Sequence, residues 1–185
     1  MNESRVGSRY AKSLLELAIE RNVLDQVEKD MVYFLAVCDA SPEFVRVMGN
    51  PIIPHPKKKA ILDQLFTGKV SDLTLAMFKL ITEKQREEYI VSMAHEFAAM
   101  YRENKGIELA EVTTSYPLQD EQRVQFINLV AKKTGKKVEL TEKVKPAILG
   151  GYILKIGDRM IDESIQSKLT RLKSKLNDNS YTPQI

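Results

Sequence analysis

The chain has 185 residues, of which 43% are hydrophobic and 29% are charged. This composition is typical of a folded protein and excludes a disordered one, and the length allows one domain or two small ones. The 28 basic and 25 acidic residues give a net charge of +3, which is too small an excess for a protein that holds nucleic acid mainly through its phosphates.

The apolar residues of the first 105 positions follow helical spacing throughout. The first helix carries one stripe at Val6, Tyr10, Leu14 and Leu17 and a second beside it, so it is apolar on two faces. The spacing predicts further helices over residues 23–38, from residue 41 onward, and over residues 57–66, 72–83 and 87–104. Three prolines between positions 50 and 56 predict a connector there. Together these elements predict a six-helix bundle.

From residue 107 the pattern changes to period two, which is typical of strands. We predict strands over residues 107–113, 137–141, 152–156 and 159–161, a helix over residues 119–134 closed by glycine, and a last helix. The last two strands form a hairpin that turns at Gly157 and Asp158. The last helix places four apolar residues on one side, namely Ile165, Leu169, Leu172 and Leu176.

Charge divides the chain at the same place. Residues 1–105 carry 15 basic and 15 acidic groups, whereas residues 106–185 carry 13 basic and 10 acidic groups. The whole positive excess therefore lies in the second part. We predict a mainly α protein, with a helical bundle over residues 1–105 and a small α/β domain over residues 106–185.

No catalytic, cofactor-binding or metal-binding residues are predicted. The two histidines, His55 and His95, cannot form a histidine cluster for a metal, and the single cysteine, Cys38, reads as a buried, unreactive thiol. Residues 134–137 lack the upstream glycine of a phosphate-binding loop. We interpret the lysine run at residues 57–59 as a solvated first helical turn.

The two apolar faces of the first helix leave two interpretations open. One face can complete a second side of the core, or it can bind a helix of a partner, because helix-in-groove binding uses the same spacing of four and three residues. The basic side of the last helix, with Lys168, Arg171, Lys173 and Lys175, is either a solvated face or a surface for an acidic partner.

Residues 150–165, with the sequence GGYILKIGDRMIDESI, closely resemble the signature of the delta subunit of bacterial F-type ATP synthase. This family includes the mitochondrial oligomycin-sensitivity-conferring protein. Further similar positions lie along nearly the whole chain, at residues 9–12, 50–51, 86, 116–118 and 135–136. Lys145 and Glu163 depart from the residues usual in the family. The motif itself reads as structural, since Asp162 or Ser164 can cap the last helix.

The resemblance implies a non-catalytic stator subunit that links the catalytic F1 head to the b subunits of the peripheral stalk during proton-driven ATP synthesis. In the family the helical domain holds the N-terminal helix of an alpha subunit between its first and fifth helices. Carried onto this sequence, that surface comprises Tyr10, Ser13, Leu14, Leu17, Ala76, Met77, Leu80 and Glu83. The stalk contact is assigned to the last helix as a hypothesis, with Lys168, Arg171 and Lys175.

The same resemblance implies no cofactor, no nucleic-acid partner and membrane association only through the complex. No apolar run approaches the roughly 20 residues that cross a bilayer, and the first residues lack the apolar core of a secretory signal. We therefore expect a peripheral protein of the F1 sector at the cytoplasmic face of the bacterial plasma membrane. Two alternatives remain, an RNA- or ribosome-associated binding module and a hydrolase that uses carboxylates.

Overall fold

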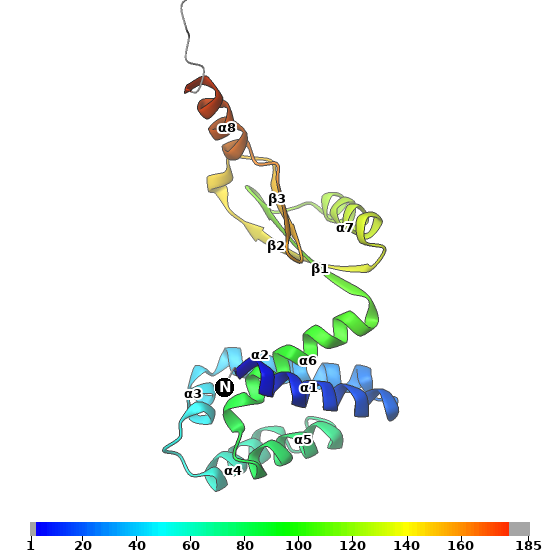
Figure 1. Cartoon of the computed structure of the whole chain (residues 1–185), viewed down its shortest axis with the longest axis vertical. Helices are drawn as coiled ribbons and strands as arrows, with labels where there is room; N and C mark the ends of the chain where they lie inside the picture. Colours follow the sequence, from blue (N-terminus) through cyan, green and yellow to red (C-terminus); the bar gives the residue numbers. More distant parts are fainter. Residues whose placement is uncertain (1–2, 178–185) are drawn as a thin grey trace, which may run out of the picture. The chain divides into compact units, whose positions relative to one another are not determined.

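The structure is a computed structural model that describes residues 3–177. The chain divides into two units, Met1–Lys105 and Gly106–Ile185 (Figure 1). Helices build the first unit, and a four-stranded sheet with two helices builds the second. The fold class predicted from the sequence is confirmed.

The helices of the first unit follow the predicted ranges closely. They are α1 Glu3–Glu20, α2 Leu24–Ala40, α3 Pro42–Gly49, α4 His55–Phe66, α5 Asp72–Glu83 and α6 Ile90–Lys105. The helix α4 begins two residues earlier than predicted, because Pro56 suits a first helical turn, where no N–H donor is needed. A single 3-10 turn, Glu87–Tyr89, precedes α6 where a continuous helix was predicted.

Aromatic rings fill the centre of the first unit. Phe34, Phe44, Phe66 and Phe78 come from four different helices and are all buried. Neighbouring ring centroids lie 5.1–6.1 Å apart, with interplanar angles of 44–76°, and this is the separation that aromatic pairs prefer. Each fully buried phenylalanine contributes on the order of 2–3 kcal/mol of transfer free energy, so this cluster is a large part of the core.

The helix α1 packs tightly along α6. Gly7 lies at the closest approach, where a Cβ atom would stand 2.6 Å from Ser92 Oγ and 3.0 Å from the backbone nitrogen of Met93. Any larger residue at this position would push the two helices apart. The sequence signal for this contact is a glycine in the second turn of a helix, which costs helix propensity and therefore indicates a packing role.

A buried carboxylate joins α2 to the start of α5. Asp30 is almost fully buried, and its Oδ2 accepts hydrogen bonds of 2.8 Å from the backbone nitrogen of Ser71 and from Thr74 Oγ1. Ser71 in turn caps α5 through its hydroxyl. A carboxylate at a helix N-terminus also interacts favourably with the helix dipole, so Asp30 fixes where α5 begins.

The second unit has one sheet with strand order β2-β1-β3-β4. Its elements are β1 Ile107–Thr114, α7 Asp120–Thr134, β2 Lys137–Val144, β3 Tyr152–Ile156, β4 Arg159–Asp162 and α8 Ile165–Asn177. The β1–β2 pair is parallel and is connected through α7, whereas β1–β3 and β3–β4 are antiparallel. The predicted hairpin at Gly157 and Asp158 is confirmed.

The core of this unit is small. Among the described residues, its buried cluster consists of Ala110, Val112, Val130 and Leu154, with partly buried residues such as Phe126 and Tyr152 around them. Gly151 brings the chain close to the residue before α8, since its φ is +72° and a Cβ atom would collide with the Glu163 carbonyl oxygen. The double glycine of the sequence motif therefore positions the start of α8.

We predict that Gly7→Ala lowers the free energy of unfolding of the helical unit by about 1–3 kcal/mol, the usual cost of overpacking, although alanine favours helix formation. Gly49→Ala is the matched control, because no atom lies within 4 Å of its ideal Cβ. Urea unfolding followed by circular dichroism measures both variants. Equal stabilities for the two would contradict the assignment of a close helix contact at Gly7.

Candidate partner-binding surfaces

The helix α1 presents one side to the core and a neighbouring side to solvent. Val6, Ala11, Leu14 and Ala18 are buried, whereas Tyr10 is half-buried and Ser13 and Leu17 are exposed. The hydroxyl of Tyr10 accepts a hydrogen bond of 3.2 Å from Arg86 Nη1, in the segment after α5. This bond ties the outer side of α1 to the end of α5.

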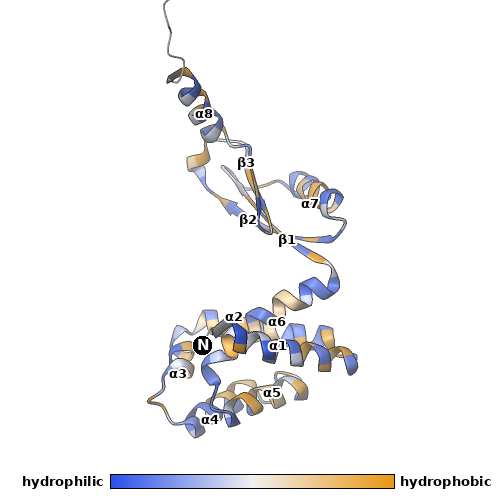
Figure 2. Cartoon of the chain, viewed as in Figure 1, coloured by the Kyte–Doolittle hydropathy of each residue, from blue (hydrophilic) through white to orange (hydrophobic). Residues whose placement is uncertain are grey.

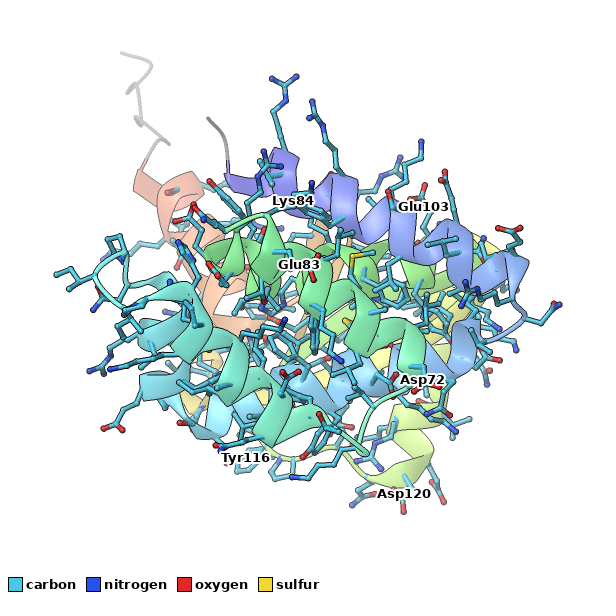
Figure 3. The ribbon with its side chains drawn as sticks, turned by 90° about the horizontal axis from the view of Figure 1, so that it is seen from below. Asp72, Glu83, Lys84, Glu103, Tyr116 and Asp120 are labelled. Carbon is cyan, nitrogen blue, oxygen red and sulfur yellow. The ribbon has the colours of Figure 1, made fainter. Side chains whose placement is uncertain are left out.

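The helix α5 lies against α1. In Figure 3 the labels Asp72 and Glu83 mark the two ends of α5, with α1 running alongside. Ala76, Leu80 and Glu83 are exposed, and Leu80 keeps 42% of its surface accessible. Two neighbouring helices thus each expose apolar side chains.

Two of the residues assigned to this surface are placed differently from the expectation. Leu14 is completely buried and Met77 is nearly so, because both lie on the edge where the outer stripe meets the core stripe. Their side chains lie in the core beneath this surface and are not accessible to a partner. The accessible set, called the α1–α5 face from here on, consists of Tyr10, Ser13, Leu17, Ala76, Leu80 and Glu83.

The α1–α5 face has the chemistry of a helix-binding surface. Leu17 and Leu80 are 37% and 42% exposed, Tyr10 adds an aromatic ring, and Glu83 is the single charge. Apolar side chains at helical spacing on one element suit an amphipathic helix of a partner. Such a surface binds by burying apolar area and carries no group arranged for bond chemistry.

The second candidate surface is α8. Its four apolar residues, Ile165, Leu169, Leu172 and Leu176, are between 45% and 67% exposed, and in Figure 2 hydrophobic and hydrophilic residues alternate along this helix. Lys168 Nζ lies 2.9 Å from Glu163 Oε2. Arg171 Nη2 donates a hydrogen bond of 3.3 Å to the carbonyl oxygen of Asp162. Lys175 is exposed.

Asp162 holds the first turn of α8. Its Oδ2 accepts a hydrogen bond of 2.6 Å from the hydroxyl of Ser167, and its Oδ1 accepts one of 2.9 Å from the backbone nitrogen of Ser164. The Ser164 hydroxyl in turn accepts from the backbone nitrogen of Ser167. The predicted capping is confirmed for Ser164, whose hydroxyl accepts from a backbone N–H of the helix, whereas Asp162 binds the Ser164 N–H just before α8 and the Ser167 hydroxyl. These bonds, that from the Ser167 hydroxyl above all, lower the pKa of Asp162 to about 2.

The interpretation of the lysine run as solvated is wrong for its middle residue. Lys58 is only 3% exposed, and its Nζ donates a hydrogen bond of 2.8 Å to the Met48 carbonyl oxygen. The buried carboxylate of Glu87 lies 3.9 Å from this Nζ and 2.8 Å from His55 Nδ1. A signal was present in the sequence, since Lys58 stands four residues before Leu62, on the same side of the helix.

The remaining candidates for chemistry are structural. Cys38 is buried, and burial, with a smaller effect of Asp39, raises the pKa of its thiol to about 11, so the reactive thiolate is scarce at neutral pH. Within residues 3–177, no three His, Cys, Asp or Glu side chains are grouped to hold a metal ion. In the same range, no helix combines the length and apolar character of a membrane span.

Exposed apolar side chains on helices of both units are typical of a protein that assembles with other proteins. Comparison with known proteins agrees with this class. Residues 6–176 match the family described as ATP synthase delta (OSCP) subunit. The ATP synthase subunit delta of Cytophaga hutchinsonii is 45% identical over 185 residues, which is 100% of this chain and 98% of that protein. The subunit delta of Desulforamulus reducens is 36% identical over 95% of this chain and 97% of its own length.

A solved structure gives the same result. A chain in the mitochondrial ATP synthase hexamer of Toxoplasma gondii superimposes with a TM-score of 0.72 at 25% identity, and the match covers 96% of this chain and 98% of that one. The protein belongs to the ATP synthase delta (OSCP) subunit family. It is a non-catalytic stator subunit, which links the F1 head to the peripheral stalk of F-type ATP synthase.

The Asp162 cap makes the start of α8 sensitive to acid. The carboxyl of Asp162 has a folded-state pKa of about 2 against an ordinary value of 3.8. Its stabilising effect is therefore complete above pH 3.8 and is lost as the pH falls through about 2. We expect a carboxyl ¹³C titration of Asp162 to show its midpoint near 2, and Ser167→Ala to move that midpoint upward. A midpoint at or above 3.8 in the wild-type protein would refute this cap.

Proposed function

We propose that the α1–α5 face binds the N-terminal helix of an alpha subunit and that the second unit binds the ends of the b subunits in the peripheral stalk. The observation that carries the first assignment is the pair of exposed leucines, Leu17 on α1 and Leu80 on α5, on neighbouring helices. Family membership supports the choice of partner.

A helix laid on this face gains mainly from apolar burial. Covering the exposed parts of Leu17, Leu80 and Tyr10 removes apolar surface from water, which is worth roughly 25 cal/mol for each Å². Screening by salt acts on charges and leaves this term almost unchanged. The proposed attachment to the F1 head should therefore hold at high ionic strength.

The stalk contact is proposed for α8. Lys168, Arg171 and Lys175 lie on this exposed helix, and a basic surface suits an acidic partner. Attachment at two separate units suits a stator, because simultaneous binding at both ends is far stronger than either contact alone. The mechanism is mechanical: the protein keeps the catalytic hexamer from turning with the rotor and makes or breaks no bond.

The place of action follows from the complex. The ATP synthase is a membrane-associated assembly, and we infer that this subunit sits peripherally, at the cytoplasmic face of the bacterial plasma membrane, as part of the F1 sector. Its membrane association then depends on the other subunits.

The ion pairs of the second unit argue against a role in binding RNA. Lys136, Lys143 and Lys168 pair with Glu108, Glu111 and Glu163 at 2.8–2.9 Å. Lysines that are already neutralised by neighbouring carboxylates release few counterions from a polyanion. Three of the basic residues of this unit are thus matched by acidic neighbours, which leaves fewer cations to bind a polyanion.

We predict that a synthetic peptide of the alpha-subunit N-terminus binds the full chain and that Leu80→Asp weakens binding roughly 10- to 100-fold, because a carboxylate would be buried against the peptide. Isothermal titration calorimetry measures this. Tyr10→Ala should also weaken binding, whereas Tyr10→Phe, which keeps the ring, should retain most of it.

Val32→Asp is the matched control for Leu80→Asp, because Val32 is an exposed apolar residue on α2, outside the α1–α5 face. It should bind the peptide as the wild type does. If no variant of the α1–α5 face changes peptide affinity, the peptide binds elsewhere. If the wild type does not bind at micromolar concentrations, the proposed attachment to the alpha subunit is wrong.

A further inference from the structure

The helix α8 is attached to its own unit by its polar side. Ser167 and Arg171 both make hydrogen bonds to Asp162, and both lie on the side of α8 opposite its apolar residues. The apolar side chains remain 45–67% exposed, although Ile165 Cδ1 lies close to Gly150 of the same unit, 2.7 Å from the position of an ideal Cβ there. A surface helix of a globular protein normally turns its apolar stripe toward the core, so this arrangement is inverted.

The exposed apolar residues repeat as in a coiled coil. Ile165, Leu169, Leu172 and Leu176 are separated by four, three and four residues, which places them at d, a, d and a of two heptads. The seam is about 16 Å long at 1.5 Å per residue. It is also narrow, since no other apolar residue occurs in Ile165–Asn177.

Lysines flank the seam on both sides. In the heptad register Lys168 and Lys175 occupy g positions and Lys173 an e position, and these positions choose the partner in coiled coils. We propose that α8 pairs, as a short coiled coil, with one amphipathic helix of another protein that carries acidic residues beside its own apolar seam. This inference rests on the proposed stalk attachment and specifies the chemistry of the stalk helix.

A second copy of this chain does not fit the seam. In a parallel pair Lys168 of one copy would face Lys173 of the other, and in an antiparallel pair lysines at g would face lysines at g. Like charges at these positions are destabilising. The charge pattern therefore selects a different, acidic helix.

A membrane surface is also a poorer fit. Helices that lie in a bilayer interface carry a wide apolar face, commonly with tryptophan or phenylalanine. The seam of α8 has two apolar residues in each heptad, and Ile165–Asn177 contains no aromatic residue. A protein helix matches this shape better.

The register also separates the roles of the three cations assigned to the stalk contact. Arg171 occupies a c position, away from the seam, and donates to the Asp162 carbonyl oxygen. It is a positioning residue that orients α8. Lys173, which the hypothesis for the stalk contact does not include, is a contact residue together with Lys175 and with Lys168, whose Nζ also pairs with Glu163 of its own unit.

The test uses the full chain and two synthetic 21-residue peptides with leucine at a and d. One peptide carries glutamate at e and g, and the other carries lysine there. We expect calorimetry to show micromolar binding of the glutamate peptide and at least roughly tenfold weaker binding of the lysine peptide. Binding of the glutamate peptide should weaken several-fold between 0.05 and 0.5 M NaCl, values chosen to span about 14 to 4 Å of screening length.

Variants locate the binding on α8. The double variant Leu169→Asp, Leu172→Asp should bind the glutamate peptide roughly 100-fold more weakly than the wild type. Ile52→Asp changes an exposed apolar residue of the other unit and should leave the affinity for this peptide unchanged. Lys173→Glu with Lys175→Glu should reverse the preference in favour of the lysine peptide. These surface changes leave the buried core intact, and circular dichroism checks this.

Three results would overturn the inference: equal binding of both peptides, self-association that Leu169→Asp abolishes, or binding of phosphatidylserine vesicles that requires the seam. A C-terminal fragment of the b subunit separates the inference from the proposed function. If that fragment binds the wild type and the Leu169→Asp, Leu172→Asp variant equally, the coiled-coil inference is wrong and the stalk attachment stands. If the glutamate peptide binds and the fragment does not, the inference stands and the stalk attachment is wrong.

Discussion

The packing of α1 against α6 is the constraint on which the first unit depends. Gly7 lets the two helices approach until a Cβ atom would collide with Ser92, and this leaves the other apolar stripe of α1 to lie beside α5. The α1–α5 face exists because α1 packs one apolar side into the core and leaves the neighbouring apolar side accessible to solvent. A helix with a single apolar stripe would have completed the core and offered nothing to a partner.

The second unit also leaves apolar side chains of a helix exposed, but it holds that helix by polar contacts. Its buried cluster is small, and α8 adds no apolar residue to it. Hydrogen bonds from Ser167 and Arg171 to Asp162 hold the polar side of α8 instead. These bonds are local and need no burial, so the three leucines of α8 stay more than half exposed. Both units thus leave apolar side chains exposed, as expected of a subunit that works only within an assembly.

The sequence predicts which helices carry exposed apolar residues, and its errors concern which individual residues are buried. Six of the eight residues assigned to the surface on α1 and α5 are at least partly accessible, whereas Leu14 and Met77 are buried. Lys58 was taken for a solvated residue although it bonds to Met48 inside the protein. Residues at the margin between two stripes can turn either way, because the neighbouring helices decide which side is covered.

The sequence by itself determined the order and type of nearly every element, the place where helices give way to strands, and the family. Periodicity, prolines and glycines act over a few residues and are therefore readable in one dimension. Only the tertiary structure decided which side of each helix is buried, that Asp30 and Lys58 find partners more than ten residues away or in another element, and that α8 turns its leucines outward. Those outcomes depend on contacts between distant segments, which local pattern does not encode.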